Sequence, residues 1–184
     1  MRTLPLIVLL LIASSVAAQR APVVGEVLPG ILIEDKGEVA VIDDELRFEP
    51  WSSAALRGQW TLMQYLAARP SADKLNRWAL DEISGLADNG DLRDFKLFNI
   101  INVDDVSFGA TGFALGAIKS NKKKHPEAPM VADMGHGRAH WGLNPKSSAI
   151  FVLDPDNRVR FFRDGALSQA DVQRIIGLLT PPAD

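Results

Sequence analysis

The closing stretch of the chain, residues 147–179, constrains the fold more than any other part of the sequence. Residues 149–153 form an unbroken apolar run of strand length that is rich in β-formers. A turn follows at Asp154-Pro155-Asp156-Asn157, because Pro fixes one φ angle and the Asp and Asn side chains bond to their own backbone. Residues 159–162 then return as a second strand. The pattern predicts a tight antiparallel hairpin.

A helix is predicted directly after this hairpin. Ser168 is a candidate N-cap, and Asp171, three residues later, completes a capping box. Apolar side chains then recur at the spacing of one helix face, at Val172, Ile175, Ile176 and Leu179. We therefore expect the chain to end with a strand, a turn, a strand and a helix that buries one face.

Strand and helix patterns also alternate along the middle of the chain. Short strands are expected at residues 31–33 and 39–42, joined by a hairpin loop at 34–37, and core strands at 60–66, 97–103 and 129–132. Helices are expected over residues 72–86, with Ser71 as N-cap, and over 111–121, with Phe113, Ala114, Ala117 and Ile118 buried. This order predicts an α/β fold with a mixed sheet flanked by helices and an N-terminal β-hairpin extension.

The start of the sequence has the composition of a secretory signal peptide. Arg2 supplies a short positive region, residues 6–13 are apolar, and Val16-Ala17-Ala18 offers small residues before Gln19. We expect cleavage after residue 18, a single domain over residues 19–184, and no stable membrane insertion afterwards, because the apolar run is short for a span. An uncleaved anchor is the alternative.

The chain has no cysteine, which excludes several classes of protein. A secreted protein of this kind has no disulfide and depends on its own core, which the 47% of hydrophobic residues among 184 can supply. It also lacks the thiol that carries the lipid of a bacterial lipoprotein. We therefore expect a protein free in the bacterial periplasm. The net charge of −3 argues against a nucleic-acid partner.

Several segments resemble the framework of thioredoxin-like thiol oxidoreductases and peroxiredoxins. The likeness rests on Gly25 and Pro29, residues 35–37, Leu56-Arg57-Gly58, the strand that ends at Tyr65, and residues 151–156. In those enzymes this strand is followed by the catalytic cysteine at a helix start, whereas here the place holds Arg69-Pro70-Ser71-Ala72. The cis-proline position of that fold falls at about Ser148.

The whole mature chain more closely resembles the YtfJ family of periplasmic proteins, which is cysteine-free in the same place. The shared points are Trp51-x-Ser53-Ala54-x-Leu56-x-Gly58, Arg69-x-Ser71-Ala72, Asn99–Asp105, Ser120-Asn121-Lys122-Lys123 and Asp164-Gly165-Ala166-Leu167. The resemblance implies a thioredoxin-like fold and a periplasmic location, and it implies no activity. Thiol–disulfide and peroxidase chemistry are excluded, because a serine hydroxyl forms no equivalent of the disulfide.

The first functional hypothesis is a catalytically silent module that binds a peptide or another envelope protein and needs no cofactor. Thioredoxins hold substrate at the helix start and at the loop before the last hairpin, so the candidate ligand-binding residues are Arg69, Pro70, Ser71, Asp73 and Ser148. A free helix N-terminus and the Arg69 charge favour an extended acidic ligand. Ser71 as a nucleophile is disfavoured, because no histidine lies near it in the sequence.

The alternative is a metal-dependent or metal-binding protein. His136 and His140 are four residues apart, which places both imidazoles on one face of a helix, and Asp133 and His125 could complete four ligands. Gly135 and Gly137 weaken the helix that this requires.

Three other charged clusters each have a structural and a functional interpretation. Asp43-Asp44-Glu45 is expected at a bend, as a solvated cluster or a hard-cation site. Asp104 and Asp105 follow a core strand, where ligands gather in α/β sheets. Lysines at 119 and 122–124 are expected at a helix C-terminus. They either have a structural role there, since the helix dipole favours cations, or form a docking patch for an acidic partner. A subunit of a larger assembly is a third, purely structural possibility.

Overall fold

We describe a computed structural model of the chain over residues 19–106 and 109–182. The expected signal peptide, residues 1–18, lies outside the described residues, so its cleavage stays a prediction. Within the described part of the chain, no helix combines the length and the apolar composition needed to cross a bilayer.

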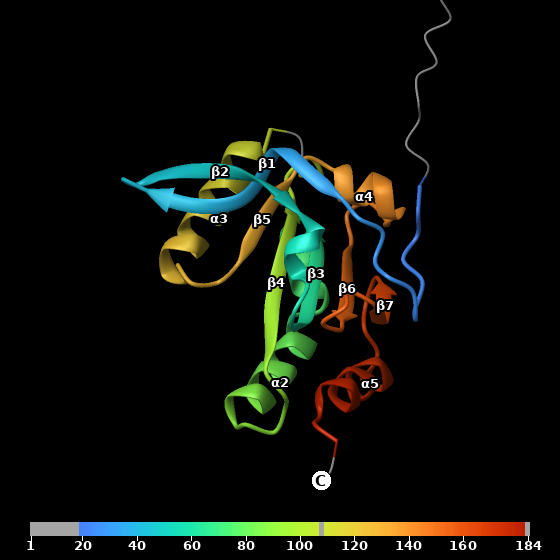
Figure 1. Cartoon of the computed structure of the whole chain (residues 1–184). Coiled ribbons are helices and arrows are strands. Elements are labelled where there is room, and N and C mark those ends of the chain that lie inside the picture. Colours follow the sequence, from blue (N-terminus) through green and yellow to red (C-terminus); the bar gives the residue numbers. More distant parts are fainter. Residues whose placement is uncertain (1–18, 107–108, 183–184) are drawn as a thin grey trace, which may run out of the picture.

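The described residues form a seven-stranded mixed sheet with the order β2-β1-β5-β4-β3-β6-β7 (Figure 1). The strands are β1 (Leu32–Ile42), β2 (Glu45–Ser52), β3 (Trp60–Ala67), β4 (Phe95–Asn102), β5 (Met130–Asp133), β6 (Ser148–Leu153) and β7 (Val159–Asp164). β3, β4 and β5 run parallel to one another, whereas the other neighbours are antiparallel. The expected α/β fold with a mixed sheet is confirmed.

The N-terminal hairpin is present, but its turn lies elsewhere than expected. β1 runs straight through residues 34–37, and the turn is made by Asp43 and Asp44, with φ of 50° and 61°. A two-residue hairpin turn needs positive φ at both positions, which Asp tolerates better than most residues. Gly37 instead marks a β-bulge: its φ is 98°, and an added Cβ would lie 2.0 Å from the Glu49 carbonyl oxygen.

The helices are the short η1 (Ser53–Leu56), α1 (Pro70–Leu75), α2 (Arg77–Asp88), α3 (Thr111–Lys124), α4 (His136–Trp141) and α5 (Gln169–Leu179). The helix expected over residues 72–86 is thus two helices, which meet at the buried Asn76. Ser71 as N-cap was wrong. The N-cap is Arg69, since Pro70 takes the first helical position, where its missing N–H is not needed.

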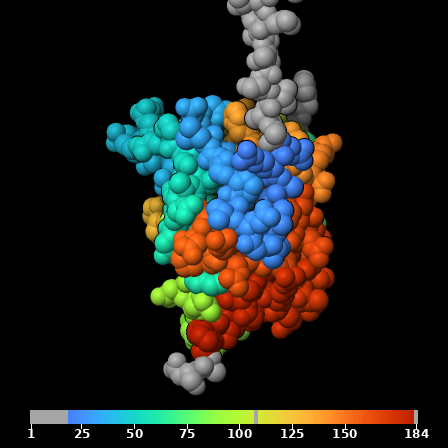
Figure 2. Space-filling view, turned by 45° about the vertical axis from the view of Figure 1, so that its right-hand side comes forward, coloured from blue at the N-terminus to red at the C-terminus, as the bar shows by residue number. Residues whose placement is uncertain are grey.

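The closing unit forms as its sequence predicts. β6 and β7 pair as an antiparallel hairpin, and α5 begins with the complete capping box of Ser168 and Asp171. Such a cap contributes on the order of 1 kcal/mol. In Figure 2 the segment that leads into β1, in blue, lies against this C-terminal unit, and Val27 bridges to Arg158. Backbone hydrogen bonds of Gly25 and Glu26 with Val159 hold this segment at the start of β7.

The two faces of the sheet are covered differently. One face carries the largest apolar cluster, which includes Tyr65 and Phe151 and is closed by Trp141 of α4. The other face carries two separate clusters, one beneath α2 and α5 and one beneath α3. The middle of β3 and β4 lies between these two clusters, and this arrangement positions the candidate site.

α3 covers less of the sheet than its sequence suggests. Ile118 is buried as expected, but Phe113 is 85% exposed and Ala117 is also exposed, so their expected burial was wrong. The apolar stripe of the helix turns toward the space between α1 and α3 instead of into a closed core. The molecule thus holds a large apolar side chain at its surface.

Candidate functional site

Of the expected ligand-binding residues, Arg69 has a structural role. Its guanidinium donates to the Asp105 carbonyl oxygen at 2.9 Å, to a carboxylate oxygen of Asp105 at 3.2 Å and to the Val106 carbonyl oxygen at 2.8 Å. These bonds join the start of α1 to the segment after β4. The charge of Arg69 is therefore already paired.

The remaining residues at the start of α1 are exposed or paired. Ser71 is exposed and has a helical position in the first turn. Asp73 forms an ion pair with Arg77, one turn further on. This helix start therefore offers a smaller free charge than the sequence suggested.

Ser148 is buried, and the described chain contains no cis peptide bond there or elsewhere. Its hydroxyl accepts from Gln64 Nε2 at 2.9 Å and from Asn76 Nδ2 at 3.4 Å. Asn76 also donates to the Gly165 carbonyl oxygen and accepts from the Leu167 backbone N–H. Ser148 thus belongs to a polar network that ties the α1–α2 break to the β7–α5 connection.

A groove of about 600 Å³ opens between α1 and α3, above the middle of β3 and β4. Arg69, Pro70 and Asp73 line it, so three of the five expected residues do come together here. Most of the remaining lining is apolar and includes Leu66, Ile101, Ala114, Ala117 and Met130, with the exposed Phe113 at its α3 side.

Two carboxamides interrupt the apolar floor of this groove. Gln64 and Asn99 are register partners on the parallel strands β3 and β4, so their side chains lie next to each other on one face. Neither residue was predicted from the sequence to belong to a site. The available signal was a polar residue at the centre of an apolar strand, as in Met63-Gln64-Tyr65 and Phe98-Asn99-Ile100.

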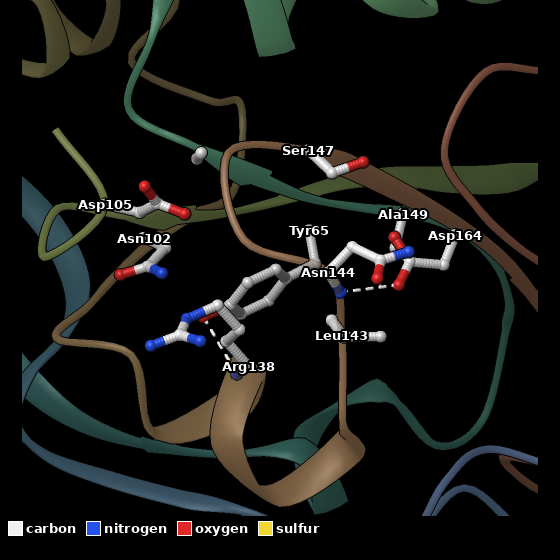
Figure 3. A pocket seen from close by; sticks show the side chains of 10 residues that line it. Tyr65, Asn102, Asp105, Arg138, Leu143, Asn144, Ser147, Ala149 and Asp164 are labelled. Atoms are coloured by element: carbon white, nitrogen blue, oxygen red, sulfur yellow. Dashed lines mark hydrogen bonds between the residues drawn. The ribbon is translucent and has the colours of Figure 1, made fainter. Parts of the chain in front are cut away.

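A second polar site lies beneath α4, on the opposite face of the sheet (Figure 3). The Tyr65 hydroxyl donates to Asp133 Oδ2 at 2.6 Å and accepts from the Arg138 backbone N–H at 3.0 Å. Burial, together with the Asp133 charge, raises the pKa of Tyr65 far above its usual range. Tyr65 therefore stays protonated and acts as a fixed donor.

This polar site is too closely packed to hold a water molecule, although polar side chains surround it. Asn102 Nδ2, Arg138 Nε and Asp164 Oδ1 line it and have no hydrogen-bond partner within the described residues. Gly137 allows α4 to pack closely against Tyr65, because an added Cβ would lie 2.6 Å from the Tyr65 ring. The arrangement is that of a core contact between α4 and β3.

The structure does not assemble the metal ligands suggested by the sequence. Asp133 is buried, and its carboxylate already accepts from Tyr65 and from the backbone N–H groups of His136 and Gly137. His136 Nε2 lies 3.3 Å from Asp35, while His140 Nε2 is buried without a partner in the described chain. Across residues 19–106 and 109–182, no three His, Asp or Glu side chains are grouped as a metal site.

The other charged clusters have structural contacts. Asp105 holds Arg69 and accepts from the Lys146 backbone N–H, whereas Asp104 is exposed. Asp44, at the tip of the β1–β2 hairpin, accepts from Lys123 at 2.8 Å and pairs with Lys119 at 3.1 Å. These lysines lower the pKa of Asp44, the hydrogen bond from Lys123 first. They tie the hairpin to α3.

Solved structures with a similar fold include a thiol peroxidase and a thiol-disulfide isomerase. A thiol peroxidase from Chromobacterium violaceum superposes with a TM-score of 0.54 at 14% identity and covers 88% of each chain. A thiol-disulfide isomerase from Corynebacterium glutamicum gives 0.52 at 16% identity, over 82% of this chain and 98% of that one. These similarities show the thioredoxin-like fold. The absence of cysteine excludes their thiol chemistry here.

Comparison of sequences is more specific than comparison of folds. The uncharacterized protein YtfJ of Escherichia coli K12 is 34% identical over 156 residues, which cover 84% of each chain. An uncharacterized protein of Haemophilus influenzae is 33% identical over 153 residues, or 83% of this chain and 82% of that one. The family model described as "Bacterial protein of unknown function (YtfJ_HI0045)" matches residues 23–181. The chain therefore belongs to the YtfJ_HI0045 family of bacterial proteins.

Proposed function

We propose that the protein is a non-redox, thioredoxin-like binding module of the bacterial periplasm, and that it holds a peptide or a segment of an envelope protein in the groove between α1 and α3. The observation that carries the proposal is the groove itself, about 600 Å³ and mostly apolar, with the 85% exposed ring of Phe113 beside it. The signal-like composition of residues 1–18 supports the location.

The size and lining of the groove favour binding. Ligand sites are typically concave, mostly apolar and of about 300–1,000 Å³, with a few polar groups that orient the ligand. Covering a Phe side chain from water contributes roughly 1.5–3 kcal/mol. A partner that covers Phe113 would therefore gain affinity without any rearrangement of the core.

The position of the groove agrees with the analogy to thioredoxins. Arg69, Pro70 and Asp73 occupy the helix start at which thioredoxin-like enzymes present their cysteine, and all three line the groove. One fold supports many functions, so the position alone does not assign one. The position supports the proposal because the same place is independently hollow and apolar.

Site-specific photo-crosslinking in living cells tests the proposal. The crosslinking residue replaces Phe113, which lines the groove, or Ser71, which is exposed in α1 between the lining residues Pro70 and Asp73. The control position is Gln173 on the exposed side of α5. Arg69 is unsuitable because its guanidinium holds the segment after β4.

A discrete adduct from positions 71 and 113, absent from position 173, is the expected result, and mass spectrometry of that adduct identifies the partner. Equal and diffuse labelling from all three positions would count against the groove as a binding surface. Fractionation of the same cells tests the location, since a cytoplasmic signal would contradict it.

A further inference from the structure

We propose that the groove takes an uncharged, extended stretch of polypeptide, whose backbone is hydrogen-bonded by the side-chain carboxamides of Gln64 and Asn99. This inference rests on the proposed function and narrows it to one chemical class of ligand. It follows from the placement of the two carboxamides, from the pairing of the charged groups at the groove, and from the exposed Phe113.

The two carboxamides lie at the centre of the groove floor. Gln64 and Asn99 pair in register between β3 and β4, on the sheet face between the cluster beneath α2 and α5 and the cluster beneath α3. Adjacent strands are about 4.8 Å apart, so the two side chains are direct neighbours. A ligand in the groove passes over both of them.

Both side chains have free hydrogen-bonding capacity. Gln64 is only 6% exposed, and its Nε2 donates to Ser148 Oγ at 2.9 Å, which fixes the amide. Within the described residues, Gln64 Oε1 accepts no hydrogen bond, and the half-buried Asn99 side chain makes none. Neither side chain has a fully buried unpartnered atom in the described residues, so these groups face the groove, where a ligand can bond to them in place of water.

A carboxamide has the same donor and acceptor as a peptide group. An extended chain presents N–H and C=O groups along its length, so Asn99 can donate to a carbonyl and accept from an N–H, while Gln64 Oε1 accepts from another N–H. An acyl chain would fill the apolar walls equally well, but it would leave these groups unpaired. The floor therefore favours a peptide over a lipid.

The charges at the groove are already neutralised. The charged residues that line it are Arg69, Asp73 and Arg77. Arg69 is bonded to Asp105, and Asp73 is paired with Arg77. A charged ligand side chain would have to compete with these pairs. The acidic ligand suggested by the sequence is therefore replaced by an uncharged one, with an apolar side chain against Phe113.

Nuclear magnetic resonance of the isotope-labelled protein tests the inference. The probe is an acetylated and amidated peptide of alternating valine and serine. The comparison probes are the same peptide with methylated backbone nitrogens, and laurate as an acyl chain. We expect the unmodified peptide to shift the side-chain amide signals of Gln64 and Asn99, and methylation to weaken its binding about tenfold or more.

Substitution of Asn99 provides a second measurement. Asn99→Leu keeps the branched shape of the side chain but removes the donor and acceptor, so the peptide should bind about tenfold more weakly while laurate binding is unchanged or stronger. Asn89→Leu, in the exposed turn after α2, is the matched control and should leave both affinities unchanged. The backbone spectrum of each variant verifies its folding, and the methylated peptide needs no variant at all.

Peptide binding that is indifferent to both methylation and Asn99→Leu would overturn the inference, as would binding of laurate alone or of neither probe. The proposed function fails separately: it is contradicted when Ser71 and Phe113 give no discrete crosslink in cells. A discrete crosslink together with carboxamide-independent binding would leave the binding module in place and refute only the peptide-backbone contact.

Discussion

At the scale of single residues, Tyr65 is the buried polar group with the clearest role. Its hydroxyl donates to the buried Asp133 carboxylate and accepts from the α4 backbone. Within the described residues, Tyr65 is the only side chain that donates to this carboxylate, so Tyr65→Phe removes a hydrogen bond to a charged group, which contributes about 1.5–3 kcal/mol. We expect the free energy of unfolding in urea to fall by that amount.

A neighbouring residue on the same strand provides the control. Thr61 is fully buried, and its hydroxyl has no partner within the described residues. Thr61→Val has nearly the same shape and removes an unpaired polar group, so it should be neutral or stabilising. A loss of stability in Thr61→Val equal to that in Tyr65→Phe would show that the strand, and not the hydrogen bond, is sensitive to substitution.

Asp171 makes the stability depend on pH. The side chain of Arg163 and the backbone N–H of Ser168 lower the pKa of Asp171 from 3.8 to about 2. Because the folded pKa is the lower one, the carboxylate stabilises the fold above its ordinary pKa, and this contribution is lost as the pH falls toward 2. Asp171→Asn should therefore remove up to about 2 kcal/mol at neutral pH and progressively less as the pH falls, with little of the difference left at about pH 2.

The measurement is the free energy of unfolding at a series of pH values. The difference between wild type and Asp171→Asn should shrink as the pH is lowered through the range from about 5 to 2. Asp81→Asn, an exposed site on α2, controls for the change in net charge. A difference that stays constant over this range would contradict a role for the Asp171 charge and leave only a change in packing.

At the scale of elements, local patterns predicted element types better than they predicted the points where elements begin and end. The closing hairpin and α5 form as predicted because their signals are local: an apolar run, a Pro-Asp turn and a capping box. The break at Asn76 could not be predicted, because its contacts are with Gly165 and Leu167, far along the chain. These long-range contacts, and not the helix propensity of the sequence, determine where the helix breaks.

Gly37 is a second boundary that the sequence did not resolve. A glycine near the end of a polar run indicates a turn, yet here it permits a bulge in β1 against Glu49. Gly37→Ala places a Cβ against the Glu49 carbonyl oxygen at a positive φ, so we expect it to destabilise the protein by about 1–3 kcal/mol. Urea unfolding measures this change.

Gly30→Ala is the matched substitution. Gly30 lies just before β1, its φ is not in the left-handed region, and an added Cβ meets no atom within 4 Å. It should change the free energy of unfolding by less than about 0.5 kcal/mol. If Gly37→Ala were equally well tolerated, the bulge would not require a glycine, and the close approach to Glu49 would be relieved by a small shift of the hairpin.

At the scale of the whole molecule, the fold was predictable and the candidate site only partly so. Of the five candidate residues taken from the resemblance, Arg69, Pro70 and Asp73 line the groove, and their role in binding stays a prediction. The groove itself arises from the way α2 and α3 leave the middle of β3 and β4 between two apolar clusters. That gap depends on helix positions, which periodicity does not give, and so the exposure of Phe113 was missed.

Phe113 allows binding and stability to be separated in one variant. Its side chain is 85% exposed and lies outside the buried clusters, so Phe113→Ser should change the free energy of unfolding by less than about 0.5 kcal/mol. The same change removes the largest apolar surface beside the groove and should abolish the discrete crosslink formed from Ser71. Trp78→Ser, a half-exposed aromatic residue of α2 that does not line the groove, should leave that crosslink intact. Loss of the crosslink in both variants would point to a general effect of surface aromatic residues, whereas loss in Phe113→Ser alone, with unfolding unchanged, would assign the exposed ring to binding.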